Sequence, residues 1–352
     1  MDRYIGLDVH AASTTMAIVG PSGRRIATHV LETNGRALIA ALKLVPGIKH
    51  LCLEEGTEAE WLAEVLKQHV DELVVTRGAA NRGTKNDAVD AFALAEKLRT
   101  GQIKVRIYKD AGPVRRLREL ARLHAMITGD VVRTKNRIKG LFRSRGVQTD
   151  DEIYIPDSRA AWLKKLPAEK RWAAVILFAE LDTQTELRKK AEAELLEEAA
   201  KHRAATLLRS CPGLGPIRAA QLVAIVITPT RFRTKRQFWA YCGLGVVTRS
   251  SADWARDRKG QWQRVKTQQT RGLNRQFSRP AKNILKGAAT TAIASSDSPL
   301  GLEFRRLVDS GTKPNLAKLT IARRIAAIAL SVWKHNEEYD PKRLKTDSRL
   351  AS

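Results

Sequence analysis

The first hundred residues alternate between short β-branched runs and segments of helical spacing. Residues 3–10, 14–20 and 26–31 read as strands, and a Pro-Ser-Gly turn separates the last two. Beyond them the apolar spacing alternates between the period of a helix and the continuous apolar runs of buried strands. The expected elements are a helix at 37–45, a strand at 49–55, a helix at 57–70 and a strand at 72–76. The pattern predicts an α/β unit that ends near residue 103.

From residue 113 to 146 the pattern becomes that of one long basic helix. Its apolar stripe consists of Leu117, Leu120, Ile127, Val131, Ile138 and Leu141. Its other faces carry Arg115, Arg116, Arg118, Arg122, Arg133, Lys135, Arg137, Lys139, Arg143 and Arg145. A charge run is usually a solvated face, but such faces mix signs and this one holds few acids. The helix is therefore expected to contact phosphates.

The rest of the chain reads as mainly helical. Residues 158–208 predict one or two long helices broken near Pro167, and their Ala/Glu/Lys-rich second half is typical of a coiled-coil arm for subunit contacts. A Pro-Gly-Leu-Gly-Pro turn at 212–216 lies between two apolar helices, as in a helix-hairpin-helix element that binds phosphate, or as a simple turn. Residues 231–290 mix aromatic and basic side chains, and 314–339 predict a final helix.

The net charge narrows the class of partner. Lys and Arg number 63 against 37 acidic residues, which gives a charge of +26. Such an excess favours nucleic acid, because neutralised phosphates release counterions, although a basic ribosome-associated or membrane-surface protein has similar composition. No apolar run approaches the ~20 residues of a membrane span, and no signal peptide is evident. Three scattered cysteines argue against disulfides and zinc and favour a reducing cytoplasm.

Four acids stand out by their positions. Asp8 lies in an otherwise apolar strand, where burial is costly without a cation or strong donors. Glu54 ends a second apolar strand, and its neighbour Glu55 reads as a surface residue. Asp87 and Asp90 lie within one turn at a helix start, although Asp87 could instead simply cap that helix. Converging carboxylates suit hard cations such as Mg²⁺, and two such ions can support phosphoryl transfer.

These motifs resemble a known family. IGLDVH, LCLEEGTEAEWL, KNDAVDAFALAEKLR, PGLGP, YCGLGVVTRSSADW and ARRIAAIALSVWK are similar, in this order, to the DEDD transposases of the one-ten insertion-sequence family, which are also described as bridge-RNA-guided recombinases. The resemblance implies an α/β plus α fold: a RuvC/RNase H-like N-terminal domain, a helical coiled-coil insertion and a mainly helical C-terminal transposase domain. It places the family's four acids on Asp8, Glu54, Asp87 and Asp90.

The resemblance also implies the chemistry. The family forms a covalent phosphoserine with DNA, and the matching stretch offers Ser250 and Ser251. Ser251 is favoured because the small Ala252 follows it. Many members have glycine at that place and a proline where this chain has Val246, so the choice between the serines stays open. Mg²⁺ on the four acids would polarise the phosphate and lower the pKa of the serine hydroxyl.

Further expectations concern partners and place. The resemblance implies DNA at the element ends and target, a structured guide RNA, and dimers that pair into a tetramer. Nucleic-acid contacts are expected from the basic helix and around the serine. The residues are Arg115, Arg116, Arg118, Arg122, Arg133, Lys135, Arg137, Lys139, Arg249, Arg258 and Lys259. The expected location is the bacterial cytoplasm, with association to the nucleoid and no membrane.

The expected domains follow these signals. Residues 1–105 form the RuvC-like metal-binding domain, and 106–205 the basic helix and coiled-coil arm. Residues 206–290 form the C-terminal transposase domain with the helix-hairpin-helix-like motif and the serine, and 291–352 form a helical tail.

Three rival interpretations remain. A RuvC-like nuclease would use the metal with water and leave no covalent adduct. A sugar kinase or related ATPase has a similar opening hairpin, but normally carries a second glycine-rich phosphate loop and near-neutral charge, which this sequence lacks. A non-catalytic nucleic-acid-binding protein would use the acids only as structural caps.

Overall fold

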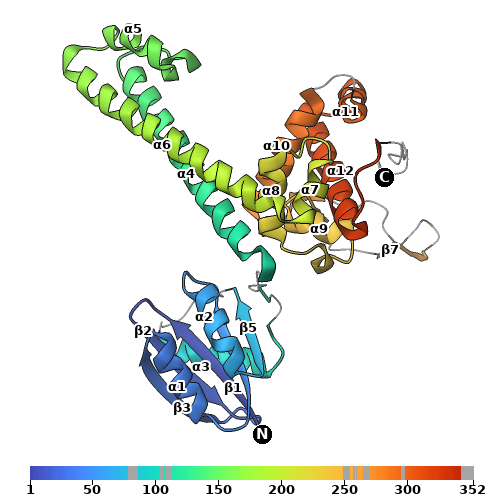
Figure 1. Ribbon diagram of the computed structural model, residues 1–352. Helices are drawn as coiled ribbons and strands as arrows, with labels where there is room; N and C mark the ends of the chain where they lie inside the picture. Colours follow the sequence, from blue (N-terminus) through green and yellow to red (C-terminus); the bar gives the residue numbers. More distant parts are fainter. Residues whose placement is uncertain are drawn as a thin grey trace. The chain divides into compact units, whose positions relative to one another are not determined.

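The computed structural model divides into two compact units, Met1–Gly112 and Pro113–Ser352 (Figure 1). The described residues are 1–77, 86–103, 106–107, 112–248, 254–256, 258, 260–264, 270–294 and 298–341. None of the described helices is both long enough and apolar enough to cross a membrane.

The first unit is built on a five-stranded mixed sheet in the order β3-β2-β1-β4-β5. Its strands are β1 (Asp2–Val9), β2 (Ser13–Val19), β3 (Arg25–Glu32), β4 (Ile48–Glu54) and β5 (Glu72–Thr76). Strands β1, β2 and β3 pair antiparallel, whereas β1, β4 and β5 pair parallel. All five predicted strands are confirmed, and β5 agrees residue for residue. The mixed α/β architecture is consistent with an RNase H-like DEDD domain.

Helices cover both faces of this sheet. They are α1 (Gly35–Leu44), α2 (Ala59–Leu66), the 3-10 turn η1 (Lys67–His69) and α3 (Asp87–Arg99). Apolar residues alternate along β1 and β4, so Ile5, Leu7 and Leu53 join the buried cluster with α1 and α2. On the opposite face Cys52 packs with Leu94 of α3. Helix α3 therefore covers the face that bears the even-numbered residues of β1 and β4.

Two long helices dominate the start of the second unit. Helix α4 (Arg115–Arg143) packs along α6 (Ala168–Ala200), and Figure 1 shows the pair as an elongated arm. Around Phe142 and Phe178 a small core closes the end that also holds α5 (Arg159–Lys164). The predicted break at Pro167 is confirmed, since α6 begins at the next residue. The short 3-10 turns here are η2 (Gly112–Val114), η3 (Asp151–Tyr154) and η4 (Pro156–Ser158).

The remaining helices share one large apolar core. They are α7 (Arg203–Arg209), α8 (Pro216–Val226), α9 (Lys235–Tyr241), α10 (Arg279–Ala294), α11 (Pro299–Asp309) and α12 (Pro314–His335), with the 3-10 turn η5 (Pro229–Arg231). The final helix is shorter than predicted, because Asn336 ends it in the left-handed conformation.

Four short strands in this unit were not predicted. Strand β6 (Val246–Thr248) pairs with β9 (Thr270–Leu273), and β7 (Trp254–Arg256) pairs with β8 (Trp262–Arg264). Each pair forms a two-stranded antiparallel sheet of its own. With only three or four residues per strand, these segments carry too little alternation to be recognised in the sequence.

Candidate metal centre

Two of the four acids lie on the face of the sheet that α3 covers. Side chains alternate along β1, so Asp8 shares its face with Gly6, and Glu54 shares the same face through Cys52. The parallel register sets Leu7 beside Leu53. Asp8 and Glu54 are therefore the next neighbours at the carboxyl ends of the two strands.

Helix α3 brings the other two acids to this edge. Asn86 caps the helix, since its side chain accepts a hydrogen bond from the backbone N–H of Ala88 at 2.9 Å. Asp87 is therefore not the helix cap, which was one reading of its position. The buried face of α3 includes Ala91 and Leu94, and Asp87 and Asp90 extend that face by one turn toward β1.

A histidine joins the acids. His10 Nε2 lies 3.4 Å from Asp8 Oδ2 and 3.5 Å from Asp87 Oδ1. One ligand atom from each of these three residues lies within 4.8 Å of the others. His10 was not among the site residues predicted from the sequence. Its position could have indicated it, because side chains alternate along an extended chain and a residue two positions after Asp8 projects to the same side.

Electrostatics indicate that these carboxylates crowd one another. Burial raises the pKa of Asp8 above its ordinary value, and the negative charges of Asp87 and Asp90 raise it further, while His10 opposes the shift. Like charges that raise each other's pKa are relieved by a bound cation. Carboxylate oxygens with an imidazole nitrogen form a donor set that divalent ions accept. The residues thus fit a divalent metal.

Glu54 takes a more peripheral position among the described groups. It is half-buried at the end of β4, and the three converging ligand atoms belong to Asp8, His10 and Asp87. Its place beside Asp8 comes from the strand register. Glu55, read from the sequence as a surface residue, is exposed and donates its backbone N–H to Thr76.

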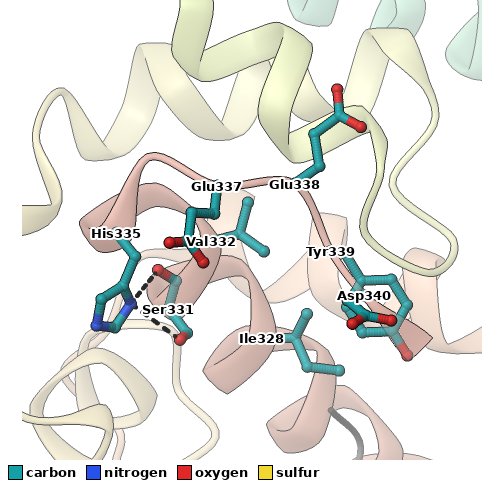
Figure 2. Close-up of a pocket in the computed structure, with 8 residues that line it drawn as sticks. All are labelled: Ile328, Ser331, Val332, His335, Glu337, Glu338, Tyr339 and Asp340. Carbon is teal, nitrogen blue, oxygen red and sulfur yellow. Dashed lines mark hydrogen bonds between the residues drawn. The ribbon is translucent and has the colours of Figure 1, made fainter. Parts of the chain in front are cut away.

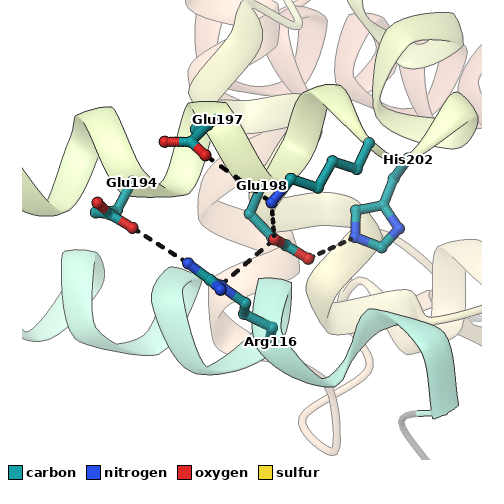
Figure 3. A network of polar contacts seen from close by, with 6 residues as sticks. Arg116, Glu194, Glu197, Glu198 and His202 are labelled. Atoms are coloured by element: carbon teal, nitrogen blue, oxygen red, sulfur yellow. Dashed lines mark hydrogen bonds and ion pairs between the residues drawn. The ribbon is translucent and has the colours of Figure 1, made fainter.

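The expected nucleic-acid residues of α4 lie on the second unit, and one of them anchors a polar network (Figure 3). Arg116 pairs with Glu194 and Glu198 of α6, at 3.4 Å in each case. The Glu198 side chain is only 9% exposed and also receives Lys201 at 3.1 Å and His202 at 3.3 Å. The pKa of Glu198 lies below its ordinary value, mainly because Lys201 donates a hydrogen bond to its carboxylate. His202 and Arg116 lower this pKa further. Arg116 therefore joins α4 to α6.

Several other cations of α4 also have acidic neighbours. The pairs are Arg122 with Glu119, Arg133 with Asp130, Arg137 with Glu180 at 3.3 Å, and Lys139 with Asp151 at 3.7 Å. Lys135 lies over the ring of Tyr154 at 4.3 Å. Arg115 is exposed and Arg118 half-buried. The expectation of a face with few acids was incomplete, because α4 itself supplies Glu119 and Asp130, and α6 and the segment after α4 supply further carboxylates.

The region expected to carry the nucleophile is described only in part. Ser250, Ser251, Arg249 and Lys259 lie outside the described residues. Arg258 is described and is exposed in the turn between β7 and β8.

The turn between α7 and α8 permits a close helix contact. Gly213 has a φ of +71°, and a Cβ there would lie 2.1 Å from the carbonyl oxygen of Ala288. Helix α8 begins at Pro216, and its N-cap Gly215 offers no side chain to the first turn. Gly213 thus permits the close packing of the turn on α10, and Gly215 leaves backbone N–H groups at the start of α8 without a side-chain cap.

A pocket of about 140 Å³ lies at the end of α12, and none of the residues that line it is a predicted site residue (Figure 2). It is lined by Ile328, Ser331, Val332, His335, Glu337, Glu338, Tyr339 and Asp340. Ser331 holds the His335 ring through a 2.9 Å contact with its carbonyl oxygen. The Ser331 hydroxyl also lies 3.3 Å from His335 Nδ1, but that nitrogen donates its N–H to the Ser331 carbonyl and so is not a free base for the hydroxyl.

Comparison with known proteins identifies the family. Residues 5–145 match a family model described as a transposase, the model of the IS110 DEDD transposases. Residues 205–299 match a model described as the transposase IS116/IS110/IS902 family. No curated protein matches the chain. The two matches lie in the order that the motifs predict and together cover more than half of the sequence, with the four acids inside the first. The chain belongs to the IS110 family of DEDD transposases.

Proposed function

We propose that this transposase cuts and rejoins DNA at insertion-sequence ends through a covalent phosphoserine. Asp8, Glu54, Asp87 and Asp90 would hold divalent metal, and Ser251 would be the nucleophile. The observation that carries the proposal is the convergence of Asp8, Asp87 and His10, whose ligand atoms lie within 4.8 Å of one another. Families with this acidic signature typically bind divalent metal, which supports the assignment.

The crowded carboxylates are the second support. Burial and the acidic neighbours raise the pKa of Asp8, and the positive charge of a bound cation would offset both effects. Magnesium is the proposed ion, because oxygen ligands dominate the set. When bound, it would supply positive charge to the phosphate oxygens.

The chemistry assigned to the chain's own residues exchanges one phosphate ester for another, so the phosphate is never released by hydrolysis. The Ser251 Oγ attacks phosphorus, its proton passes to water, and the bond to the 3′ oxygen breaks. That oxygen takes up a proton and leaves as a 3′-hydroxyl, while the 5′ phosphate stays esterified to serine. Attack by the 3′-hydroxyl of another strand reverses these changes and restores the serine.

The partners proposed are DNA and a structured guide RNA, with a homo-oligomer as the working form. The charge of +26 supports a nucleic-acid partner of either kind. The candidate phosphate contacts are exposed cations: Arg115, Arg133 and Arg137 on α4, and Arg258 in the turn between β7 and β8. Arg116 is a weaker candidate, because one of its two acidic partners, Glu198, is buried and joins α4 to α6, whereas Arg133 and Arg137 each pair with a single, more exposed acid.

The proposal is tested by strand cleavage and joining in vitro. Purified protein with its co-purifying RNA is incubated with DNA carrying the element ends, with and without Mg²⁺. We expect joined product only with metal, and none from Asp8→Asn. Cleaved product without joining would instead indicate a water-dependent nuclease.

A further inference from the structure

The hairpin of β7 and β8 displays two tryptophans to solvent. Trp254 is 59% exposed and Trp262 is 61% exposed. Among the described residues, neither belongs to the apolar core of the unit. A two-stranded hairpin is marginally stable in water and normally keeps large aromatic surfaces covered. Such a surface indicates a binding partner.

The strand register places these tryptophans on one face with an arginine. Trp254 and Arg256 alternate with residue 255 along β7, and Arg256 pairs with Trp262, so these three positions share a side of the hairpin. The Arg256 guanidinium lies 5.2 Å from the centre of the Trp262 ring. Arg256 thus neighbours Trp254 along β7 and Trp262 across the hairpin. The other face has Gln263.

The charge of the segment favours one kind of partner. Residues 254–264 contain Arg256, Arg258, Lys259 and Arg264 against one acid, Asp257. Aromatic rings and guanidinium planes are the groups on which unpaired bases stack, and the positive charge suits the adjoining phosphates. A protein partner would not require this excess of cations. Paired bases in duplex DNA expose no π-face to such a surface.

We propose that this face of the β7–β8 hairpin stacks unpaired bases of the DNA strand that is cut. The inference rests on the proposed function for the identity of that strand. Trp254 follows Ser251 by three residues, so their Cα atoms are separated by about 11 Å at most. The hairpin therefore holds bases that are splayed out next to the scissile phosphate.

The test measures how tightly the full-length chain binds three labelled oligodeoxynucleotides of one sequence. These are a single strand, a perfect duplex and a duplex with a short central bubble. Replacing both Trp254 and Trp262 by alanine should weaken binding to the single strand and the bubble by roughly tenfold or more. Binding to the perfect duplex should change less than about twofold. Phenylalanine at both positions should restore most of the bubble affinity, since its ring also stacks.

Trp172→Ala is the matched control, because Trp172 is 75% exposed on α6 of the same unit. It should leave all three affinities unchanged. Equal weakening for duplex and bubble, no weakening at all, or a larger effect on the matching oligoribonucleotide would overturn the proposal. Ser251→Ala should keep the preference for the bubble. The two proposals therefore fail separately, because loss of the serine chemistry leaves this binding result unaffected.

Discussion

Gly6 and Ala91 lie in direct contact, since a Cβ on Gly6 would be 1.9 Å from the carbonyl oxygen of Ala91. Strand β1 and helix α3 consequently pack backbone against backbone at this point. Two residues after Gly6 comes Asp8, and one turn before Ala91 comes Asp87. The absence of a side chain at Gly6 thus sets the separation between the strand acid and the helix acids.

Gly6→Ala is expected to disrupt the candidate metal centre. The added methyl group would push α3 away from β1, and overpacking of this kind typically costs about 1–3 kcal/mol. Unfolding by denaturant should show the lower stability, and Mn²⁺ binding followed by electron paramagnetic resonance should weaken. Gly20→Ala is the control, because its nearest atom would be the Ile26 Cδ1 at 3.5 Å. Unchanged metal binding in Gly6→Ala would contradict the role given to this contact.

Asp8→Asn should stabilise the metal-free protein while removing its activity. The folded protein raises the pKa of Asp8, so wild-type stability falls as the pH rises from the ordinary pKa of an aspartate through the raised value. Asparagine has no such loss. The melting temperature of the variant should exceed that of wild type at neutral pH and match it in acid.

Divalent metal should reverse this order. Binding to the folded state stabilises wild type by mass action, whereas the variant has lost a ligand. Calorimetry with and without Mg²⁺ measures both comparisons. A wild type that melts above Asp8→Asn without metal would show that the acids are satisfied by the protein alone.

Glu198→Gln should weaken the joint between α4 and α6. The substitution removes the negative charge that Arg116, Lys201 and His202 share and replaces one accepting oxygen with an NH2 donor, at a cost of about 1–3 kcal/mol. The pKa of Glu198 is lowered, so its contribution is present above the ordinary glutamate pKa and is lost as the pH falls through the lowered value. The difference from wild type should therefore shrink in acid.

The matched control is Glu194→Gln, which removes an acid that also pairs with Arg116 but is 55% exposed. An exposed pair contributes little, about 0–1 kcal/mol. Thermal unfolding at neutral and acid pH distinguishes the two variants. Equal effects from both would mean that the burial of Glu198 has no consequence for stability.

Arg133→Ala and Arg137→Ala together should weaken DNA binding uniformly across sequences. Each lost phosphate contact should lower the slope of log affinity against log salt concentration by about 1. Lys189→Ala, a change of an exposed cation on α6, is the control. Titrations at several salt concentrations measure the slopes. The same slope in the double variant as in wild type would remove α4 from the nucleic-acid surface.

Most of the first unit followed from local sequence patterns. Its strands are long enough to show alternation, and β5 was located residue for residue. His10 was not predicted, because a lone histidine after a strand carries no specific signal beyond its position on the same side of the chain as Asp8. The partners of Arg116 and Arg137 were not evident because they come from α6, more than forty residues away. Pairing between distant elements leaves no trace in the pattern of one helix.

The most direct measurement is a covalent-trapping assay with labelled DNA that carries the element ends. Protein, RNA, DNA and Mg²⁺ are incubated and separated on a denaturing gel. The account predicts a protein–DNA adduct that disappears in Ser251→Ala and in Asp8→Asn, and persists in Ser250→Ala. An adduct lost only in Ser250→Ala would move the nucleophile by one residue. Cleavage without any adduct would contradict the phosphoserine and favour attack by water.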